Sequence, residues 1–348
     1  MLHLTEGTNL TLEPLKRIWE NEYFQMVIMV ILMAVIVFGF WYGSQLVMGS
    51  EYPALAVASQ SMLPTLNVGD VIIVQGVSAA QINADYITGD IVVFKSPKPD
   101  DPNFRIVHRA VKKVQNSDGT WTITTHGDNN LVYAEEIFHE SALIGKVIAK
   151  IPFVGNFALF VNRLGNFYFF LIVMIIFVGI LFSLFSGDEE KESAEEEQKE
   201  KWKFFGKLDI KTIFFIILDV LLIGILLFSL FGSFTFYQIG ADPPQNVTIM
   251  GMYPDLQYHL SFKEAHNNIH NASLSHGFLT YAINCFVTDG LHQGIRRGVP
   301  TFSWMQASLL VFLLLNLWIV IRHLHLDKKL EMMIRPKTEL RESSKNSF

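Results

Sequence analysis

The stretch VASQSMLPTLNVGDVIIV, residues 57–74, decides what kind of fold this chain can build. It begins ten residues after the end of a long apolar run at 23–47, yet its pattern is different. Pro64 fixes the backbone at a turn, Gly69-Asp70 marks a second turn, and the β-branched run that follows is typical of a strand. A β-rich domain is therefore expected directly beyond a segment long enough to cross a membrane.

The composition of the 348 residues is that of a membrane protein. Half of the residues are apolar, 29 are Phe, and the mean hydropathy is +0.31, which is too apolar for an ordinary soluble domain. The net charge of -6 comes without a basic block that could bind a phosphate backbone, so no nucleic-acid partner is expected. The single Cys285 excludes an internal disulfide and a cysteine-cluster metal site.

Four apolar runs are long enough to cross the hydrocarbon core of a bilayer, which takes about 20 helical residues. They cover residues 23–47, 166–185, 212–236 and 302–321. The first run is longer than the ~7–15 residues of a secretory signal core and is followed by no clear small-x-small site, so it is interpreted as a retained anchor. Lys16 and Arg17 precede this anchor, and no basic residue follows it before Lys95. This bias predicts a cytoplasmic N-terminus and, after four spans, a cytoplasmic C-terminus.

These spans divide the chain into nine parts. The expected order is a cytoplasmic or interfacial N-terminus, a first helix, an outer β-rich domain, a second helix, a charged linker, a third helix, an outer loop of unknown role, a fourth helix and a cytoplasmic tail, at residues 1–22, 23–47, 48–165, 166–185, 186–211, 212–236, 237–301, 302–321 and 322–348. In the outer domain, β-branched runs predict strands at 71–75, 91–95, 106–114, 121–125 and 143–148. The expected fold class is a membrane-anchored, mostly-β domain with four transmembrane α-helices.

Three polar stretches of the outer domain contain the parts of a serine-dependent catalyst. They are SQSMLP, IVHRAV and THGDNN, at residues 59–64, 106–111 and 125–130. A serine hydroxyl becomes an effective nucleophile only when a base takes its proton, an acid orients that base, and donors stabilise the oxyanion. The three stretches supply one candidate for each role of nucleophile, base and acid.

Taken together and in this order, the motifs resemble those of type I signal peptidases, in particular the branch of archaea and the endoplasmic reticulum in which histidine replaces a lysine base. The resemblance covers about residues 23–166 and rests on Ser61-Met62-x-Pro64, Gly69-Asp70, Gly89-Asp90-Ile91-Val92, Val107-His108-Arg109, Gly127-Asp128-Asn129-Asn130, Gly145-Lys146-Val147 and Ile151-Pro152-x-x-Gly155. It implies a β fold that receives its substrate as an added strand. It also implies Ser61 as nucleophile, His108 as general base and Asp128 as orienting acid.

Two supporting roles stay open in this resemblance. Ser59 is a candidate oxyanion donor together with the backbone N–H of Ser61. The branch has a second acid about six residues after the Asp of its Gly-Asp-Asn-Asn motif, where this chain has Ala134. Either Glu135 substitutes from one residue further on, or Asp128 acts alone.

Alternative bases also exist in the outer domain. His126 lies two residues before Asp128, so on a strand the two side chains would share a face. A lysine base of the bacterial kind would need burial to lower its pKa. No lysine occupies the position of His108, and the candidates are Lys95, Lys112 and Lys113.

The expected function is the removal of N-terminal signal peptides from exported proteins by cleavage after small residues. The expected partners are signal-peptide-bearing precursors, the lipid bilayer and the protein export machinery, and the mechanism requires no metal and no organic cofactor. Two alternatives remain open: a membrane protease with other substrates, and a non-catalytic binding or transport component that works through its last two spans. Asp219 in the third span, with Asn316 of the fourth span as its candidate partner, is either a functional acid inside the membrane or a polar contact that only joins the two helices, and both readings stay open.

Overall fold

The computed structural model describes residues 21–96, 104–131, 134–163, 174, 177, 179, 210–237, 246–263, 268–288 and 292–323. In the first half of the chain its elements are α2 (Glu22–Met48), β1 (Ala54–Ala56), β2 (Val71–Gln75), β3 (Ile91–Lys95), β4 (Arg105–Gln115), β5 (Trp121–His126), β6 (Glu135–His139), β7 (Leu143–Ile151) and α3 (Gly155–Arg163), with short 3-10 turns at Ala79–Gln81 and Glu140–Ala142. In the second half they are α6 (Ile210–Phe231), β8 (Ser233–Tyr237), β9 (Asn246–Met250), α7 (Met252–Ser261), β10 (Asn268–Gly277), β11 (Thr280–Thr288), β12 (Gln293–Arg296), β13 (Thr301–Phe302) and α8 (Trp304–His323).

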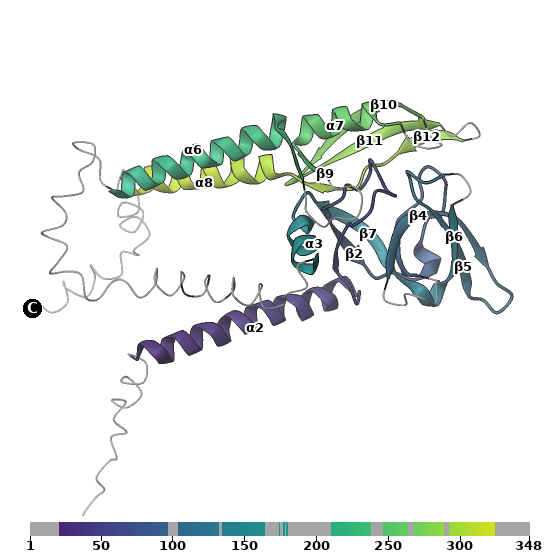
Figure 1. Cartoon of the computed structure of the whole chain (residues 1–348), viewed down its shortest axis with the longest axis horizontal. Helices are drawn as coiled ribbons and strands as arrows, with labels where there is room; N and C mark the ends of the chain where they lie inside the picture. The colour runs from purple at the N-terminus through teal and green to yellow at the C-terminus, as the bar shows by residue number, and fades with distance from the viewer. Residues whose placement is uncertain are drawn as a thin grey trace, which may run out of the picture.

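The strands predicted from the sequence are confirmed, and they belong to a sheet that runs through both halves of the chain. This sheet has 11 strands in the described residues, with the main order β10-β11-β13-β7-β3-β4-β5-β6. β2 pairs with β7 and carries β1 on its other side, while β12 pairs with β11. The two halves meet where β13 pairs in parallel with β7, at Thr301 and Lys150. Figure 1 shows the resulting β-rich body at one end of three long helices.

Three hydrophobic clusters hold this β-rich body together. The first packs Met62 and Leu66 against β2 and β3. The second lies around the stacked rings of Phe94 and Phe138, whose centroids are 4.0 Å apart. The third belongs to the second half, where α7 covers alternate residues of β11. Successive side chains of a strand point to opposite faces, so β3, which is buried on both faces, contributes alternate residues to the first and the second cluster.

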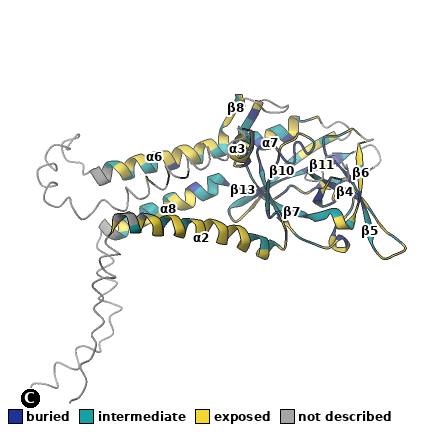
Figure 2. Cartoon of the chain, turned by 60° about the horizontal axis from the view of Figure 1, so that its bottom comes forward, coloured by how far each residue is buried: buried dark blue, intermediate teal, exposed yellow. Residues whose placement is uncertain are grey.

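Three helices of the described residues are long and apolar enough to span a membrane. They lie within α2, α6 and α8, at Val27–Met48, Ile213–Phe231 and Trp304–Ile321. Their large apolar side chains are mostly exposed along the helices, as Figure 2 shows for α2 and α6. These helices correspond to the first, third and fourth predicted spans. The second predicted span, 166–185, lies almost entirely outside the described residues.

The third span ends earlier than the sequence predicts. The expected helix ran over 212–236, whereas α6 ends at Phe231 and β8 begins at Ser233. Gly232 separates them, and its N–H donates to the carbonyl of Phe228 at 2.6 Å. Beyond the glycine, the alternating sequence SFTFY pairs with NVTIM of β9 in an antiparallel hairpin. Apolar aromatic and β-branched residues are typical both of a membrane span and of a strand. Hydropathy alone therefore predicts a helix that extends into the residues of β8.

Much of the loop predicted at 237–301 consists of helix and strands in the described residues. The sequence left 237–301 as a loop of unknown role, but β9, α7 and β10–β13 all lie within it or at its end. β10 and β11 form a long hairpin, and α7 packs on both of its strands. This part of the chain is therefore a folded layer that extends the sheet of the first half.

The contact predicted between Asp219 and Asn316 is confirmed. The side-chain amide of Asn316 on α8 donates to Oδ1 of Asp219 on α6 at 3.0 Å, and also to the carbonyl of Phe312 at 2.9 Å. A polar side chain in hydrocarbon is costly unless it finds such a partner, so the pair joins the two helices.

Candidate active site

Ser61 lies in the turn between β1 and β2, and the residues that follow it fix its position. Met62 and Leu66 are fully buried in the first hydrophobic cluster, and Pro64 is buried between them. The N–H of Leu66 donates to the carbonyl of Met62 at 2.8 Å, which closes the turn. Ser61 itself is only half-buried. A rigid turn therefore holds a partly accessible hydroxyl, which is the arrangement that a nucleophile needs.

Ser59 lies beside this candidate nucleophile. Its hydroxyl oxygen is 3.3 Å from the hydroxyl oxygen of Ser61, which is within hydrogen-bond distance. Ser59 is exposed, and both serines line the same cavity. The geometry brings Ser59 close to the reacting centre, while its role as an oxyanion donor stays a prediction.

Ser61 and His108 line one cavity of about 350 Å³. The lining includes residues 55–59, which belong to β1 and the segment after it, and residues 104–108, which are Phe104 and the start of β4. Asn130 and Glu136 complete the polar side of the cavity. Apolar side chains form much of the remainder, including Leu55, Ile72, Val93, Ile106 and Val107. A cleft with an apolar wall and a few converging polar groups is the usual form of a substrate site.

His108 is held by a carboxylate. Its Nδ1 lies 2.7 Å from Oε2 of Glu136, and only 6% of the His108 side chain is exposed. An ionised carboxylate can only accept a hydrogen bond, so Nδ1 must carry the proton in this contact. The other ring nitrogen, Nε2, is then left to accept a proton, as a general base requires.

The register of the sheet explains why Glu136 reaches His108. Ala110 of β4 pairs with Thr125 of β5, which pairs with Glu136 of β6. Side chains of paired residues share a face, and His108 lies two residues from Ala110, so His108 and Glu136 share that face. Glu135 is one residue away and therefore points to the other face, where its Oε1 accepts a hydrogen bond from Tyr86 at 3.0 Å.

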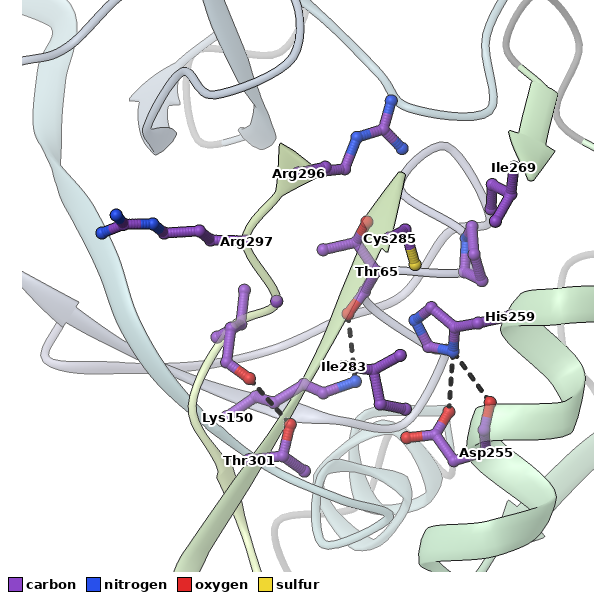
Figure 3. Close-up of a pocket in the computed structure, with 13 residues that line it drawn as sticks. Thr65, Lys150, Asp255, His259, Ile269, Ile283, Cys285, Arg296, Arg297 and Thr301 are labelled. Atoms are coloured by element: carbon purple, nitrogen blue, oxygen red, sulfur yellow. Dashed lines mark hydrogen bonds and ion pairs between the residues drawn. The ribbon is translucent and has the colours of Figure 1, made fainter. Parts of the chain in front are cut away.

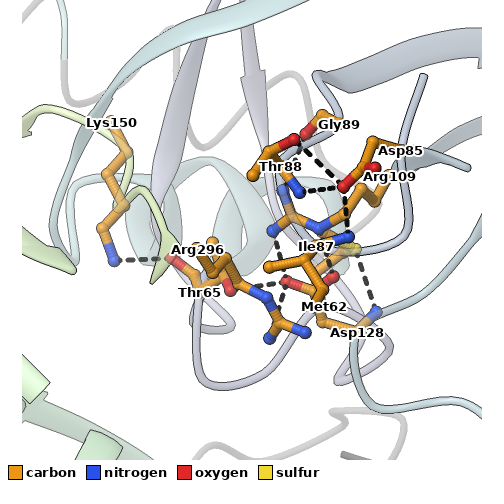
Figure 4. Close-up of polar contacts among 10 residues, drawn as sticks. All are labelled: Met62, Thr65, Asp85, Ile87, Thr88, Gly89, Arg109, Asp128, Lys150 and Arg296. Carbon is orange, nitrogen blue, oxygen red and sulfur yellow. Dashed lines mark hydrogen bonds and ion pairs between the residues drawn. The ribbon is translucent and has the colours of Figure 1, made fainter. Parts of the chain in front are cut away.

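Asp128 belongs to the opposite face, together with Arg109. The Arg109 guanidinium donates to both carboxylate oxygens of Asp128, from Nε at 2.8 Å and from Nη2 at 2.7 Å. The Thr65 hydroxyl donates to Oδ2 of Asp128 at 2.6 Å, and Nη1 of Arg296 lies 3.6 Å from the same oxygen. Figure 4 shows these side chains converging on the Asp128 carboxylate. Burial alone would raise the pKa of Asp128, but Arg109 and Arg296 outweigh burial and hold that pKa far below its ordinary value.

These contacts correct the expected pairing of the acid. The resemblance implied that Asp128 orients His108, but in the structure Glu136 makes the hydrogen bond to His108 and Asp128 is taken up by Arg109 and Thr65. The physical reason is alternation: His108 and Arg109 are neighbours on one strand, so their side chains point to opposite faces and meet different acids. The catalytic roles of both acids stay predictions.

The Gly-Asp-Asn-Asn loop fastens the turn that carries Ser61. The backbone N–H of Asn129 donates to the carbonyl of Ser61 at 2.8 Å, and its side-chain amide donates to the carbonyl of Gln60 at 3.2 Å. A Cβ atom at Gly127 would lie 2.7 Å from the Ser61 carbonyl oxygen. Glycine is therefore needed for the close approach of the two backbones.

The remaining candidate bases lie elsewhere. Nε2 of His126 contacts the carbonyl of Leu131 at 2.9 Å, which gives that ring a local partner. Lys95 lies near Glu51, and the Lys113 ammonium donates to three backbone carbonyls around Ala79–Gln81. None of these three side chains, nor Lys112, is among the residues that line the cavity. In the described parts of the chain, no three His, Cys, Asp or Glu side chains are grouped to hold a metal ion.

Sequence reasoning missed the partners that only the fold brings together. Glu136 carried a signal, because it is adjacent to the candidate Glu135 and alternation requires one of the two to share a face with His108. Arg109 also carried a signal, because a charged residue next to His108 in a strand rich in apolar residues needs an acidic partner. Thr65 and Arg296 carried none, since their partners lie far away in the sequence.

Comparison with known proteins supports the assignment of the first half. A family model described as signal peptidase, peptidase S26, matches residues 20–133. The signal peptidase complex catalytic subunit SEC11C of Rattus norvegicus is 30% identical over 142 residues, which are 39% of this chain and 70% of that protein. The corresponding SEC11 subunit of Fusarium vanettenii is 34% identical over 125 residues, 34% of this chain and 69% of that protein. The sec11 subunit of Dictyostelium discoideum is 27% identical over 175 residues, 48% of this chain and 93% of that protein.

The relatives, the matched family model and the order of the sequence motifs all indicate a signal peptidase. The mostly-β domain with Ser61 and His108 at one cavity is consistent with the same family. The chain belongs to the signal peptidase family, peptidase family S26, and is a serine endopeptidase of that family.

Proposed function

We propose that this chain removes signal peptides from exported precursor proteins, with Ser61 as nucleophile, His108 as general base and Glu136 as the acid that orients His108. The observation that carries this proposal is the shared cavity in which Ser61 lies with the His108–Glu136 pair. Family membership supplies the substrate class, because the matched relatives are catalytic subunits of signal peptidase complexes.

The proposed reaction follows from the state of the imidazole. Glu136 keeps the proton on Nδ1 of His108, so Nε2 takes the proton of the Ser61 hydroxyl as its oxygen attacks the scissile carbonyl. The resulting oxyanion is stabilised by the Ser61 N–H and the Ser59 hydroxyl. His108 then gives its proton to the leaving amine, which breaks the C–N bond and leaves an acyl-enzyme. Water hydrolyses this ester by the same route and restores the Ser61 hydroxyl.

Asp128 takes a positioning role in this scheme. It holds Thr65 of the turn that carries Ser61, while Asn129 of the same loop holds the Ser61 carbonyl. A geometric error of about 1 Å at a reacting centre can cost about 100-fold in rate. Fixing the turn is therefore a catalytic requirement even though Asp128 exchanges no proton.

We propose that the cavity binds the substrate in an extended conformation, with small side chains before the scissile bond. In the described residues β1 pairs only with β2, and the residues after β1 line the cavity. We place the precursor along these residues as an added strand, which is a common mode of peptide recognition. We expect the apolar side chains that line the cavity to set the preference for small residues before the scissile bond by steric exclusion of large ones.

The membrane anchor is part of the proposed function. α2 ends at Met48, thirteen residues before Ser61, so the nucleophile stays near the membrane surface. A signal peptide is itself a membrane segment, and tethering enzyme and substrate to one bilayer raises their effective concentration. We place the β-rich body on the extracytoplasmic face with both termini in the cytoplasm. The protein export machinery is the source of the precursors in this proposal.

The test is precursor processing in membranes that contain the full chain. Ser61→Ala and His108→Ala should each abolish the appearance of the mature protein and leave the precursor uncleaved. Ser141→Ala and His139→Ala are matched controls, because both residues are exposed and lie outside the cavity, and they should process normally. Cleavage that persists in Ser61→Ala at the wild-type rate contradicts the proposal and favours a non-catalytic component.

A further inference from the structure

The second half of the chain packs against the turn that carries Ser61, residues 61–66, which is called the catalytic turn below. The contact is made at two clusters of charged side chains. The family match ends at residue 133, so it does not include the strands and helices after residue 210. In the structure, however, β12 and α7 each place a charged side chain beside the segment that follows Ser61. The contacts of these two side chains, Arg296 and Asp255, show what the second half does there.

The first cluster contains Arg296. Its guanidinium lies 3.6 Å from Asp128, and the exposed fractions of the two side chains are 4% and 2%. The same Asp128 oxygen accepts the hydrogen bond of Thr65 at 2.6 Å. Arg296 therefore adds positive charge, from β12, to a carboxylate whose other partners are Arg109 and the catalytic turn.

The second cluster contains Asp255 of α7. Lys150 of β7 lies 3.3 Å from Asp70 and donates to the carbonyl of Thr65 at 3.0 Å. Asp255 accepts a hydrogen bond from the Tyr281 hydroxyl at 3.1 Å. It lines the same two small spaces as Lys150 and adds a second negative charge near the Lys150 ammonium. Burial disfavours the charged form of Lys150, but Asp70 and Asp255 outweigh it and hold the pKa of Lys150 above its ordinary value.

Thr65 joins the two clusters. Thr65 lies four residues after Ser61. Its hydroxyl donates a hydrogen bond to Asp128, and its carbonyl accepts one from Lys150. Figure 3 shows Thr65, Lys150, Asp255 and Arg296 around one small space. That space measures only about 10 Å³, which is close to the minimum for one water molecule. The contact between the halves is thus closely packed at the point where it meets the turn.

We infer that the second half of this chain positions Ser61, through Arg296 acting on Asp128 and Asp255 acting on Lys150, with Thr65 as the common point. Arg296 and Asp255 are positioning residues, because neither lines the substrate cavity. The inference rests on the proposed function, in which Ser61 is the nucleophile. It gives the folded layer at residues 246–302 a role in catalysis.

The test compares Arg296→Met with Arg297→Met in the full chain, purified in detergent and assayed with a signal-peptide substrate. Methionine keeps much of the length of the arginine side chain and removes its charge, and Arg109 still neutralises Asp128, so the variant should fold. Arg297 is exposed, and Figure 3 shows it pointing away from Arg296, which makes it the matched control. Unfolding midpoints are measured for each variant, and kcat is expressed per folded molecule.

For Arg296→Met we expect kcat to fall by about 10- to 100-fold with an unchanged KM, the signature of a misplaced reacting group. Arg296→Lys should recover part of the loss, and Arg297→Met should match the wild type. Asp255→Asn keeps the shape of its side chain and should lower kcat in the same direction by less. If Arg296→Met does not fold, the kcat of Asp255→Asn per folded molecule tests the inference in its place.

Two results separate the possible failures. Wild-type kcat per folded molecule in the variants, even with lowered unfolding midpoints, overturns the inference and leaves these residues a purely structural role. Ser61→Ala is assayed in parallel. If Ser61→Ala is inactive while Arg296→Met and Asp255→Asn match the wild type, only this inference fails. If Ser61→Ala still cleaves, the proposed function fails.

Discussion

The two faces of strands β4–β6 each join a basic side chain to an acid, but the two pairs are built differently. On one face His108 meets Glu136, whose side chain is 27% exposed at the edge of the cavity. On the other face Arg109 meets Asp128, and both side chains are at least 96% buried. The first pair contains an imidazole, the type of side chain that most often serves as a general base, while the second contains a guanidinium that binds the carboxylate through two hydrogen bonds. Position on a strand thus separates the pair that we propose for proton transfer from the pair that is buried on the other face.

The largest expected effect comes from the His108–Glu136 pair. Glu136→Ala should lower kcat on the order of 10⁴-fold, because His108 loses the acceptor that fixes its tautomer and orientation. Cleavage of a signal-peptide substrate by the purified full chain measures this loss. A kcat within tenfold of the wild type, about 1.4 kcal/mol in activation free energy, would show that Glu136 does not orient the base.

The buried pair should respond in stability. Asp128→Asn leaves Arg109 and Arg296 buried without their anion, and breaking such a pair costs about 3–5 kcal/mol. Urea unfolding in detergent, followed by tryptophan fluorescence, measures the change in the free energy of unfolding. Asp118→Asn makes the same chemical change at an exposed turn and is the control. Equal stability of these two variants would remove the structural role of Asp128.

The buried pair also predicts a pH dependence. Arg109 and Arg296 hold the pKa of Asp128 below its ordinary value, so its stabilising contribution is fully present above about pH 4, the unfolded value. That contribution is lost as the pH falls through the lowered folded value. As the pH is lowered from about 5, the free energy of unfolding of the wild type should therefore fall more than that of Asp128→Asn. The difference between the two acid unfolding curves isolates Asp128, and parallel curves contradict this account.

The smallest effect is expected at the neighbour of Glu136. Glu135→Ala removes one exposed hydrogen bond to Tyr86, a change of at most about 1 kcal/mol in stability, and should leave kcat unchanged. The same kinetic and unfolding measurements apply. A large loss of activity here, with normal activity in Glu136→Ala, would mean that β6 pairs one residue out of the register described above.

The location of Ser61 and His108 was within reach of the sequence, because both lie in short motifs whose turn and strand signals are local. The strands at 71–75 and 91–95 were predicted at the bounds that β2 and β3 have. Local patterns also found Asp219 and Asn316, since a polar residue in an apolar run needs a partner. The end of α6 was missed because hydropathy does not separate a span from an apolar strand.

What the sequence by itself determined is therefore the candidate site residues Ser61 and His108, the β-rich character of their domain and the long apolar segments beside it, all properties that depend on near neighbours in the chain. Only the tertiary structure decided which acid meets His108, because that choice depends on the register of β4, β5 and β6, including the irregularity between Ala110 and Lys112. It likewise decided that Arg296 and Asp255 lie beside the catalytic turn, since the parallel contact of β13 with β7 joins residues that are distant in sequence. Packing of strands across long separations carries no local signal, and that is the physical reason for the division.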